Sequence, residues 1–201
     1  MSFLSGLGQL ILGFAVFFVC LSVHEAAHAW MANRLGDPTS KFDGRLSLNP
    51  FRHIDLFGTI LLPLFLIISS LPAFGYAKPV MVNINNFRKP SRDNFLTALA
   101  GPAANLILAV IFGLVISLLP ALSFLTILVE VNIILAIFNL LPIPPLDGSK
   151  VWHLILDDET YLSLERYGPF ILIAFIFFAG SVFDYIFTID FTITSFLTNL
   201  F

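Results

Sequence analysis

The length of the apolar stretches is the feature that most constrains what this chain can fold into. A bilayer hydrocarbon core about 30 Å thick is crossed by about 20 apolar residues of α-helix. Four stretches reach that length, at residues 3–32, 95–119, 121–142 and 168–187. Because 58% of the residues are hydrophobic and only 11% are charged, most of the surface has to face something other than water. The sequence therefore predicts an all-α polytopic membrane protein with about four transmembrane helices.

A fifth apolar stretch, residues 56–74, is shorter and contains Pro63 and Pro72. It lies within residues 33–93, which carry eight of the ten Lys and Arg residues. If 56–74 dips into the membrane and returns, all ten lie on one side, which the positive-inside tendency makes cytoplasmic. If it crosses, the four basic residues that follow it are stranded on the far side. Charge therefore predicts a re-entrant segment, with both termini outside.

Residues 76–83, YAKPVMVN, combine β-branched residues, a proline and partial alternation. This pattern is typical of a short edge strand, which we expect near the membrane surface and close to the active site.

The remaining composition narrows the class of protein. No repeat, linker or cleavable signal peptide is evident, so we expect one domain over residues 1–201 without an appended regulatory module. The one cysteine, Cys20, cannot form a disulfide within the chain. A net charge of −3 with scattered basic residues argues against a nucleic-acid partner.

The first apolar stretch ends in VHEAAHAW, which places His24 and His28 four residues apart, with Glu25 directly after His24. Residues i and i+4 share one face of an α-helix, so both imidazoles can reach one ion, and the pattern is that of zinc peptidases. The alternative is a pair of core histidines. Ionisable groups at the end of an apolar helix are costly near lipid and persist mainly at functional sites, which favours a metal site.

A catalytic zinc ion usually takes three protein ligands and leaves one position for water. The best third candidate is Asp147 in NLLPIPPLDG, where prolines end the third long helix and Gly148 permits a sharp turn. Alternatively, Asp147 caps a helix that starts near Ser149. If 56–74 is re-entrant, the first and third long helices run parallel, and Asp147 then reaches the same cytoplasmic surface as the histidine pair.

Five motifs follow one another along nearly the whole chain: HEAAH at 24–28, RLSLNPFRHIDLFGTILLP at 45–63, FGYAKPVMVN at 74–83, ALAGPAANLILA at 98–109 and NLLPIPPLDG at 139–148. In this order they resemble the site-2 protease family of intramembrane metalloproteases. The resemblance implies one Zn²⁺ per chain, with His24, His28 and Asp147 as ligands and Glu25 as the catalytic glutamate. The chain is similar to the compact branch of that family, which lacks regulatory domains.

Two asparagines, Asn105 in GPAAN and Asn139 in NLLP, fall in motifs that line the active site in that family. Each is therefore a candidate for binding the substrate backbone or the developing oxyanion. The alternative is that each forms a hydrogen bond to a neighbouring helix, as polar residues in membranes often do.

The implied reaction is hydrolysis of peptide bonds in membrane-embedded protein or peptide substrates, in a prokaryotic cell membrane. Zinc activates a water molecule and polarises the scissile carbonyl, while Glu25 acts as general base. Two other readings compete, a metal-ion transporter and an inactive scaffold. The sequence shows no inverted repeat, and all four site residues are present, so it favours the protease.

Three further polar residues are expected to be peripheral. His53 is expected at the interface in a structural role, with a contact to the site as an alternative. His153 is expected on the surface of the loop that follows Trp152. Glu130 is expected near the membrane surface opposite Asp147.

Overall fold

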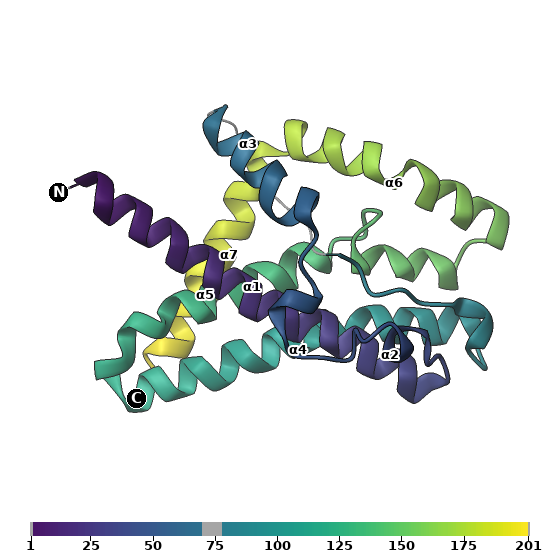
Figure 1. The fold of residues 1–201 in the computed structure, drawn as a ribbon, viewed down its shortest axis with the longest axis horizontal. Helices are drawn as coiled ribbons and strands as arrows, with labels where there is room; N and C mark the ends of the chain where they lie inside the picture. Colours follow the sequence, from purple (N-terminus) through teal and green to yellow (C-terminus); the bar gives the residue numbers. More distant parts are fainter. Residues whose placement is uncertain (1, 70–77, 201) are drawn as a thin grey trace.

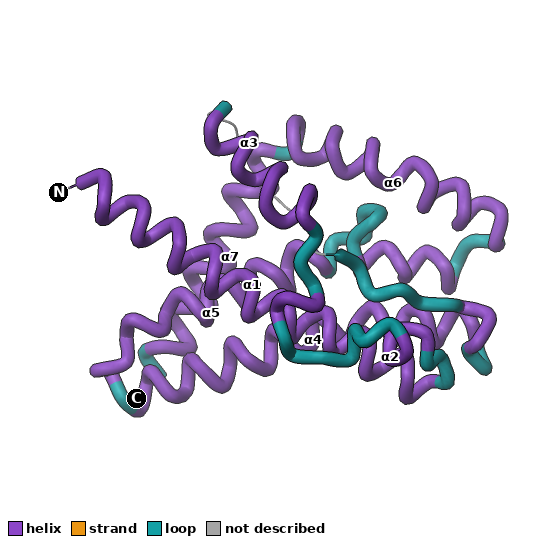
Figure 2. Tube along the Cα trace, in the orientation of Figure 1, coloured by secondary structure: helices purple, strands orange, loops and turns teal. Residues whose placement is uncertain are grey.

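The computed structural model describes residues 2–69 and 78–200 (Figure 1). This part of the chain is mostly helical and contains no strand (Figure 2). Within it, four helices are long and apolar enough to span a membrane, as the sequence predicts: Leu12–Leu35, Pro90–Leu118, Pro120–Asn139 and Asp158–Phe178.

Three helices form the centre of the molecule, α1 (Ser2–Leu35), α4 (Pro90–Leu118) and α5 (Thr126–Asn139). Helices α1 and α5 run in the same direction in Figure 1, and α4 packs against both while running the opposite way. Small residues are buried on both α1 and α4, among them Ala29 and Gly101. Small side chains let helix backbones approach closely in a membrane, which brings α4 within reach of the polar end of α1.

Two apolar clusters complete the core. Cys20 and Leu21 of α1 pack with Leu135 of α5. The second cluster joins α4, α5 and α7 (Gly180–Thr198) and consists of Ala109, Ile116, Val129, Ile133 and Leu197.

The prediction of one helix over residues 168–187 is wrong, because this stretch belongs to two helices. Helix α6 (Asp158–Phe178) begins ten residues earlier, where Asp157 caps it by accepting the Thr160 N–H, and it ends before Ala179. At Ala179 the backbone leaves the helical region (φ −99°, ψ 35°), and the chain turns back so that α7 packs against α4 and α5. Apolar residues lie on both sides of this break, so hydropathy could not locate it.

Short helices occur in the connecting segments: α2 (Thr39–Phe42), η1 (Pro50–Arg52), η3 (Ile84–Asn86), η4 (Pro120–Leu125) and η5 (Asp147–Leu154).

Hydrogen bonds hold together the two ends of the segment that connects α1 to α4. Asp37, fully buried just after α1, accepts the backbone N–H of Asn83 at 2.8 Å and the side-chain amide of Asn86 at 2.7 Å. Burial favours a raised pKa for Asp37, but hydrogen bonds from Thr39, Asn86 and Asn83 outweigh it and lower the pKa. An ionised Asp37 therefore holds the end of α1 beside the approach to α4.

The apolar stretch 56–74 lies between these joined ends. Its described part is helical, in a π-helix η2 (Leu56–Leu61) capped by Asp55 and then α3 (Leu62–Ile68). Residues 70–74 lie outside the described part of the chain. The helix through η2 and α3 is about 20 Å long, which is too short for a hydrocarbon core of about 30 Å. The hydrogen bonds that join the two ends of the connecting segment and the short length of this helix both support the prediction that 56–74 returns to the side from which it enters.

The prediction of an edge strand over residues 76–83 is wrong for the described residues 78–83, which form no strand. Their backbone donors have other partners. Lys78 N–H donates to the His53 carbonyl, Val80 N–H to the Glu25 carboxylate, and Asn83 N–H to Asp37. A strand needs a neighbouring backbone in register, and these donors are instead bonded to separate groups.

The joined ends of the connecting segment predict that Lys41 and Asn85, both exposed, lie on the same side of the membrane. Single cysteines at these positions, in a Cys20→Ser background, should both react with an impermeant thiol reagent from one side. Labelling of the two positions from opposite sides would contradict the re-entrant arrangement.

Candidate metal centre

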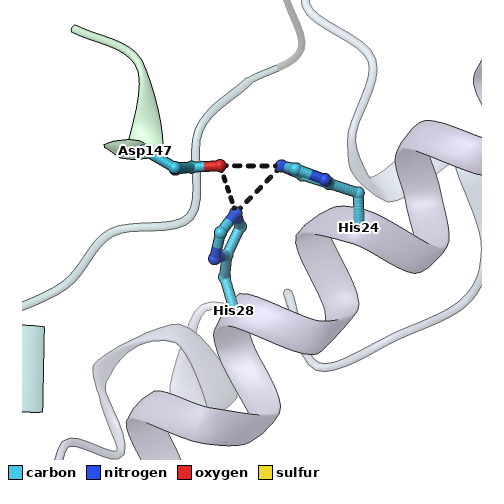
Figure 3. A group of neighbouring side chains, drawn as sticks. All are labelled: His24, His28 and Asp147. Carbon is cyan, nitrogen blue, oxygen red and sulfur yellow. Dashed lines mark hydrogen bonds and ion pairs between the residues drawn. The ribbon is translucent and has the colours of Figure 1, made fainter. Parts of the chain in front are cut away.

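Three side chains from distant parts of the sequence meet at one point (Figure 3). His24 and His28 lie one turn apart on α1, and Asp147 is the first residue of η5. The two Nε2 atoms are 3.0 Å apart, and Asp147 Oδ2 lies 3.1 Å from His24 Nε2 and 3.2 Å from His28 Nε2. Both histidines are buried and Asp147 is partly buried, so the three predicted ligands converge in a largely enclosed site.

The turn after α5 directs Asp147 toward the histidines. Gly148 lies against the end of α5, where a Cβ atom would come within 2.6 Å of the Leu141 carbonyl oxygen. The Ser149 hydroxyl donates to the Leu146 carbonyl at 2.6 Å, which closes the first turn of η5. Leu146, and not Asp147, is the N-cap residue, so the alternative role of Asp147 as a helix cap is not realised.

Hydrogen bonds fix the protonation of the two imidazoles. His28 Nδ1 lies 2.8 Å from the Thr97 carbonyl oxygen, which can only accept, so Nδ1 carries the proton. His24 Nδ1 lies 2.5 Å from Asn105 Oδ1, an amide oxygen that also can only accept, so this Nδ1 carries a proton as well. Each ring therefore turns its Nε2 to the centre of the site, and in the neutral ring this is the nitrogen whose lone pair can bind a metal.

The resulting donor set fits a zinc ion. In tetrahedral coordination with bonds of about 2.0–2.1 Å, neighbouring ligand atoms are about 3.3 Å apart, close to the observed 3.0–3.2 Å. An ionised carboxylate and two ring lone pairs at such short distances repel one another unless a cation lies between them.

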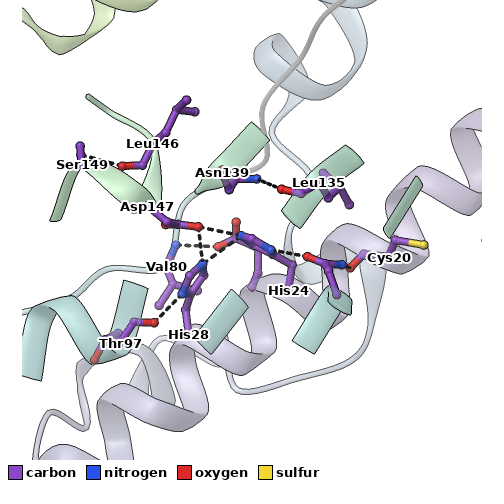
Figure 4. A network of polar contacts seen from close by, with 12 residues as sticks. Cys20, His24, His28, Val80, Thr97, Leu135, Asn139, Leu146, Asp147 and Ser149 are labelled. Atoms are coloured by element: carbon purple, nitrogen blue, oxygen red, sulfur yellow. Dashed lines mark hydrogen bonds and ion pairs between the residues drawn. The ribbon is translucent and has the colours of Figure 1, made fainter. Parts of the chain in front are cut away.

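Glu25 follows His24 on α1 and is partly exposed. Its Oε2 accepts the backbone N–H of Val80 at 3.2 Å, so the connecting segment crosses beside the metal centre (Figure 4). Glu25 is not part of the ligand triangle, the group formed by His24, His28 and Asp147. Its described hydrogen bond is therefore to the connecting segment, while its neighbour on α1, His24, is part of the triangle.

Comparison with known proteins agrees with this geometry. The sequence profile described as "Peptidase family M50" matches residues 12–121 and 117–175, most of the chain. The chain belongs to peptidase family M50. This membership confirms the resemblance to the site-2 proteases that the motifs indicate.

Relatives within the M50 family carry consistent names. The chain is 43% identical over 146 residues to "Putative zinc metalloprotease YwhC" of Bacillus subtilis, an alignment that covers 66% of this chain and 64% of the relative. It is 33% identical over 170 residues to "Putative zinc metalloprotease Rip2" of Mycolicibacterium smegmatis, covering 80% of this chain and 63% of the relative. The chain thus spans less than two thirds of the length of these relatives. No solved structure matches it.

A chain of buried amides supports this M50 site from inside the bundle. Asn105 is fully buried, and while its Oδ1 faces His24, its Nδ2 donates to Asn132 Oδ1 at 2.7 Å. Asn132, also fully buried, donates to the Leu128 carbonyl at 2.7 Å and contacts Cys20 Sγ at 3.1 Å. Asn132 therefore fixes which end of the Asn105 amide faces His24. Asn105 is placed as a positioning residue for His24, and its predicted substrate contact stays a prediction.

Sequence reasoning missed Asn132. The available signal was an amide in the middle of an apolar helix, which needs a hydrogen-bonding partner there. Asn139, the other predicted substrate contact, donates from Nδ2 to Leu135 on its own helix at 2.9 Å, and it is only partly buried beside the ligands.

The structure also places the three residues that were predicted to lie away from the metal ligands, His53, His153 and Glu130. The prediction that His153 lies on the surface is wrong. Its ring is buried, stacks on Tyr161 with centroids 4.2 Å apart, and lies 3.3 Å from the Asn94 amide nitrogen. His53 is buried as a structural residue, bonded to the Ser47 carbonyl at 2.8 Å. Glu130 is exposed near the start of α5, at the end of that helix away from the ligands.

Gly101 of α4 provides a test of the site because a side chain there would enter it. A Cβ atom would lie 2.7 Å from His24 Cε1 and closer still to His28 Nε2. We therefore expect Gly101→Ala to lower zinc affinity about tenfold or more, although alanine is the better helix former. Competition with a chelator measures the affinity.

Gly113 of the same helix is the matched control. A Cβ atom there would lie 2.6 Å from Leu197 Cβ, far along α4 from the ligands. Gly113→Ala should lower thermal stability while the folded protein keeps its zinc affinity. Equal zinc affinity in the two variants would contradict the placement of Gly101 against the ligand pair.

Proposed function

We propose that this chain is a zinc-dependent intramembrane endopeptidase that hydrolyses peptide bonds of membrane-embedded protein substrates. The observation that carries the proposal is the convergence of His24, His28 and Asp147 beside Glu25, at the end of a helix apolar enough to span the membrane. Membership of the M50 family and the names of its relatives support the same chemistry.

The ligand triangle defines what the protein contributes. Asn105 and Thr97 hold the imidazoles with Nε2 inward, and the turn at Gly148 holds the carboxylate. A bound zinc ion supplies Lewis-acid polarisation of the scissile carbonyl and lowers the pKa of water. Three protein ligands leave one position open to water and substrate, as in other catalytic zinc sites.

Glu25 is the proposed general base. It follows a metal ligand directly on α1 and stays outside the ligand triangle, so its carboxylate can take a proton from the attacking water. The same group then delivers that proton to the leaving amine. The Val80 N–H limits the freedom of the carboxylate and holds one oxygen, which leaves the other to act on water.

The placement of the site favours a substrate that is itself in the membrane. The ligands come from the second half of the span Leu12–Leu35 and from the turn after α5. Substrate helices must unwind before attack, and residues 78–82, which are in neither helix nor strand and contact Glu25 through Val80, offer backbone groups to an unwound segment. With the basic residues on the same face, we place the active site on the cytoplasmic side.

The role of Glu25 predicts that Glu25→Gln keeps full zinc content, because no ligand is changed, and loses cleavage by about a hundredfold or more. Zinc is measured by atomic absorption and cleavage with a model single-span substrate in detergent or proteoliposomes. Undiminished cleavage at equal zinc content would rule out Glu25 as the base.

The ligand role of Asp147 predicts that Asp147→Ala lowers both bound zinc and cleavage, because only two protein ligands remain. Asp157→Ala is the matched control: Asp157 caps α6, so its loss costs about 1 kcal/mol of stability and leaves zinc bound. Full zinc occupancy in Asp147→Ala would transfer the third-ligand role to another residue.

A further inference from the structure

A cavity of about 410 Å³ lies where α1 ends and α4 begins. Its lining includes four basic residues, Arg34 at the end of α1 and Arg88, Lys89 and Arg92 around the start of α4. The M50 mechanism uses none of them.

The charge of this cavity is largely uncompensated. Within residues 2–69 and 78–200, none of the four basic side chains forms an ion pair. The one acidic residue in the lining, Asp93, is buried, and its Oδ2 accepts the Lys89 backbone N–H at 3.0 Å. The cavity therefore carries an excess of about three positive charges and suits an anion.

The level of the cavity relative to the membrane indicates which anion can reach it. Arg34 lies in the last turn of the membrane-spanning part of α1, and α4 begins its own span at Pro90. Trp30, one turn before Arg34, is 51% exposed, and the Arg34 guanidinium lies 5.6 Å from its ring centroid. Tryptophan and arginine at one level on the outer surface of a membrane helix mark the headgroup region.

Topology alone does not explain the clustering. A positive-inside bias needs basic residues on one side of the membrane, but it does not need them around one cavity. Lys41 and Lys78, which we place on the same side, are exposed elsewhere in the connecting segment.

We propose that this cavity binds the headgroup phosphate of an anionic phospholipid, whose acyl chains lie along the apolar surfaces of α1 and α4. Basic pockets between transmembrane helices recognise such headgroups, and arginine guanidinium groups bind phosphate oxygens in pairs. The bound lipid bridges the ends of α1 and α4. Thr97, whose carbonyl holds His28, lies one turn beyond Asp93, so the bridged helix ends are those that assemble the metal centre.

The test is calorimetric titration of the purified, zinc-loaded full chain in neutral detergent with dioctanoyl phosphatidylglycerol, dioctanoyl phosphatidylcholine or inorganic phosphate. Saturable binding of phosphatidylglycerol that exceeds binding of both other ligands is expected. Binding of phosphatidylcholine to the same extent, or binding of inorganic phosphate as tight as that of phosphatidylglycerol, would overturn the lipid assignment.

Two charge-matched triple variants locate the site. Arg88→Gln/Lys89→Gln/Arg92→Gln should weaken phosphatidylglycerol binding about a hundredfold, the loss expected from three basic residues near a lipid surface. Lys41→Gln/Lys78→Gln/Arg166→Gln, which removes three exposed charges elsewhere, should keep it. Equal losses in the two variants would show diffuse attraction and refute the site. If the first variant fails to fold, the single Arg88→Gln and Arg92→Gln exchanges should each weaken binding, and no loss in either would equally refute it.

Discussion

The close packing of α4 against the polar end of α1 is the contact on which the metal centre depends. Gly101 leaves no side chain between the helices, so α4 reaches the imidazoles of His24 and His28. At this distance the Thr97 carbonyl and the Asn105 amide each meet an Nδ1 atom. The orientation of the two imidazoles thus follows from helix packing, so the site depends directly on the fold.

Polar groups inside an apolar bundle are stable only when they bond to one another. In this chain they form one network that runs from Cys20 and Asn132 through Asn105 to His24. Asp147 completes the site from the turn after α5, where Pro142, Pro144 and Pro145 prevent the helix from continuing. The surface of the spanning helices is left apolar, as a lipid environment requires.

Features that depend on residues close together in the sequence could be predicted from the sequence. The i, i+4 histidines, the proline-rich turn before Asp147 and the basic residues around 56–74 each have a direct physical meaning. Features that depend on tertiary partners could not be predicted. The buried stack of His153 on Tyr161 needs α6 in place, and residues 78–83 form no strand because their donors bond to Glu25, Asp37 and other separate groups. The break at Ala179 has apolar residues on both sides, so no hydropathy minimum in the sequence locates it.

X-ray absorption at the zinc edge tests the central claim most directly, because it reports the ligands without requiring a substrate. For the purified chain we expect one zinc ion with only nitrogen and oxygen ligands at about 2.0–2.1 Å and the multiple-scattering signature of two imidazoles. Loss of one imidazole contribution in His28→Ala would assign that ring. A sulfur ligand at about 2.3 Å, or a signature unchanged when His28 is removed, would contradict the account.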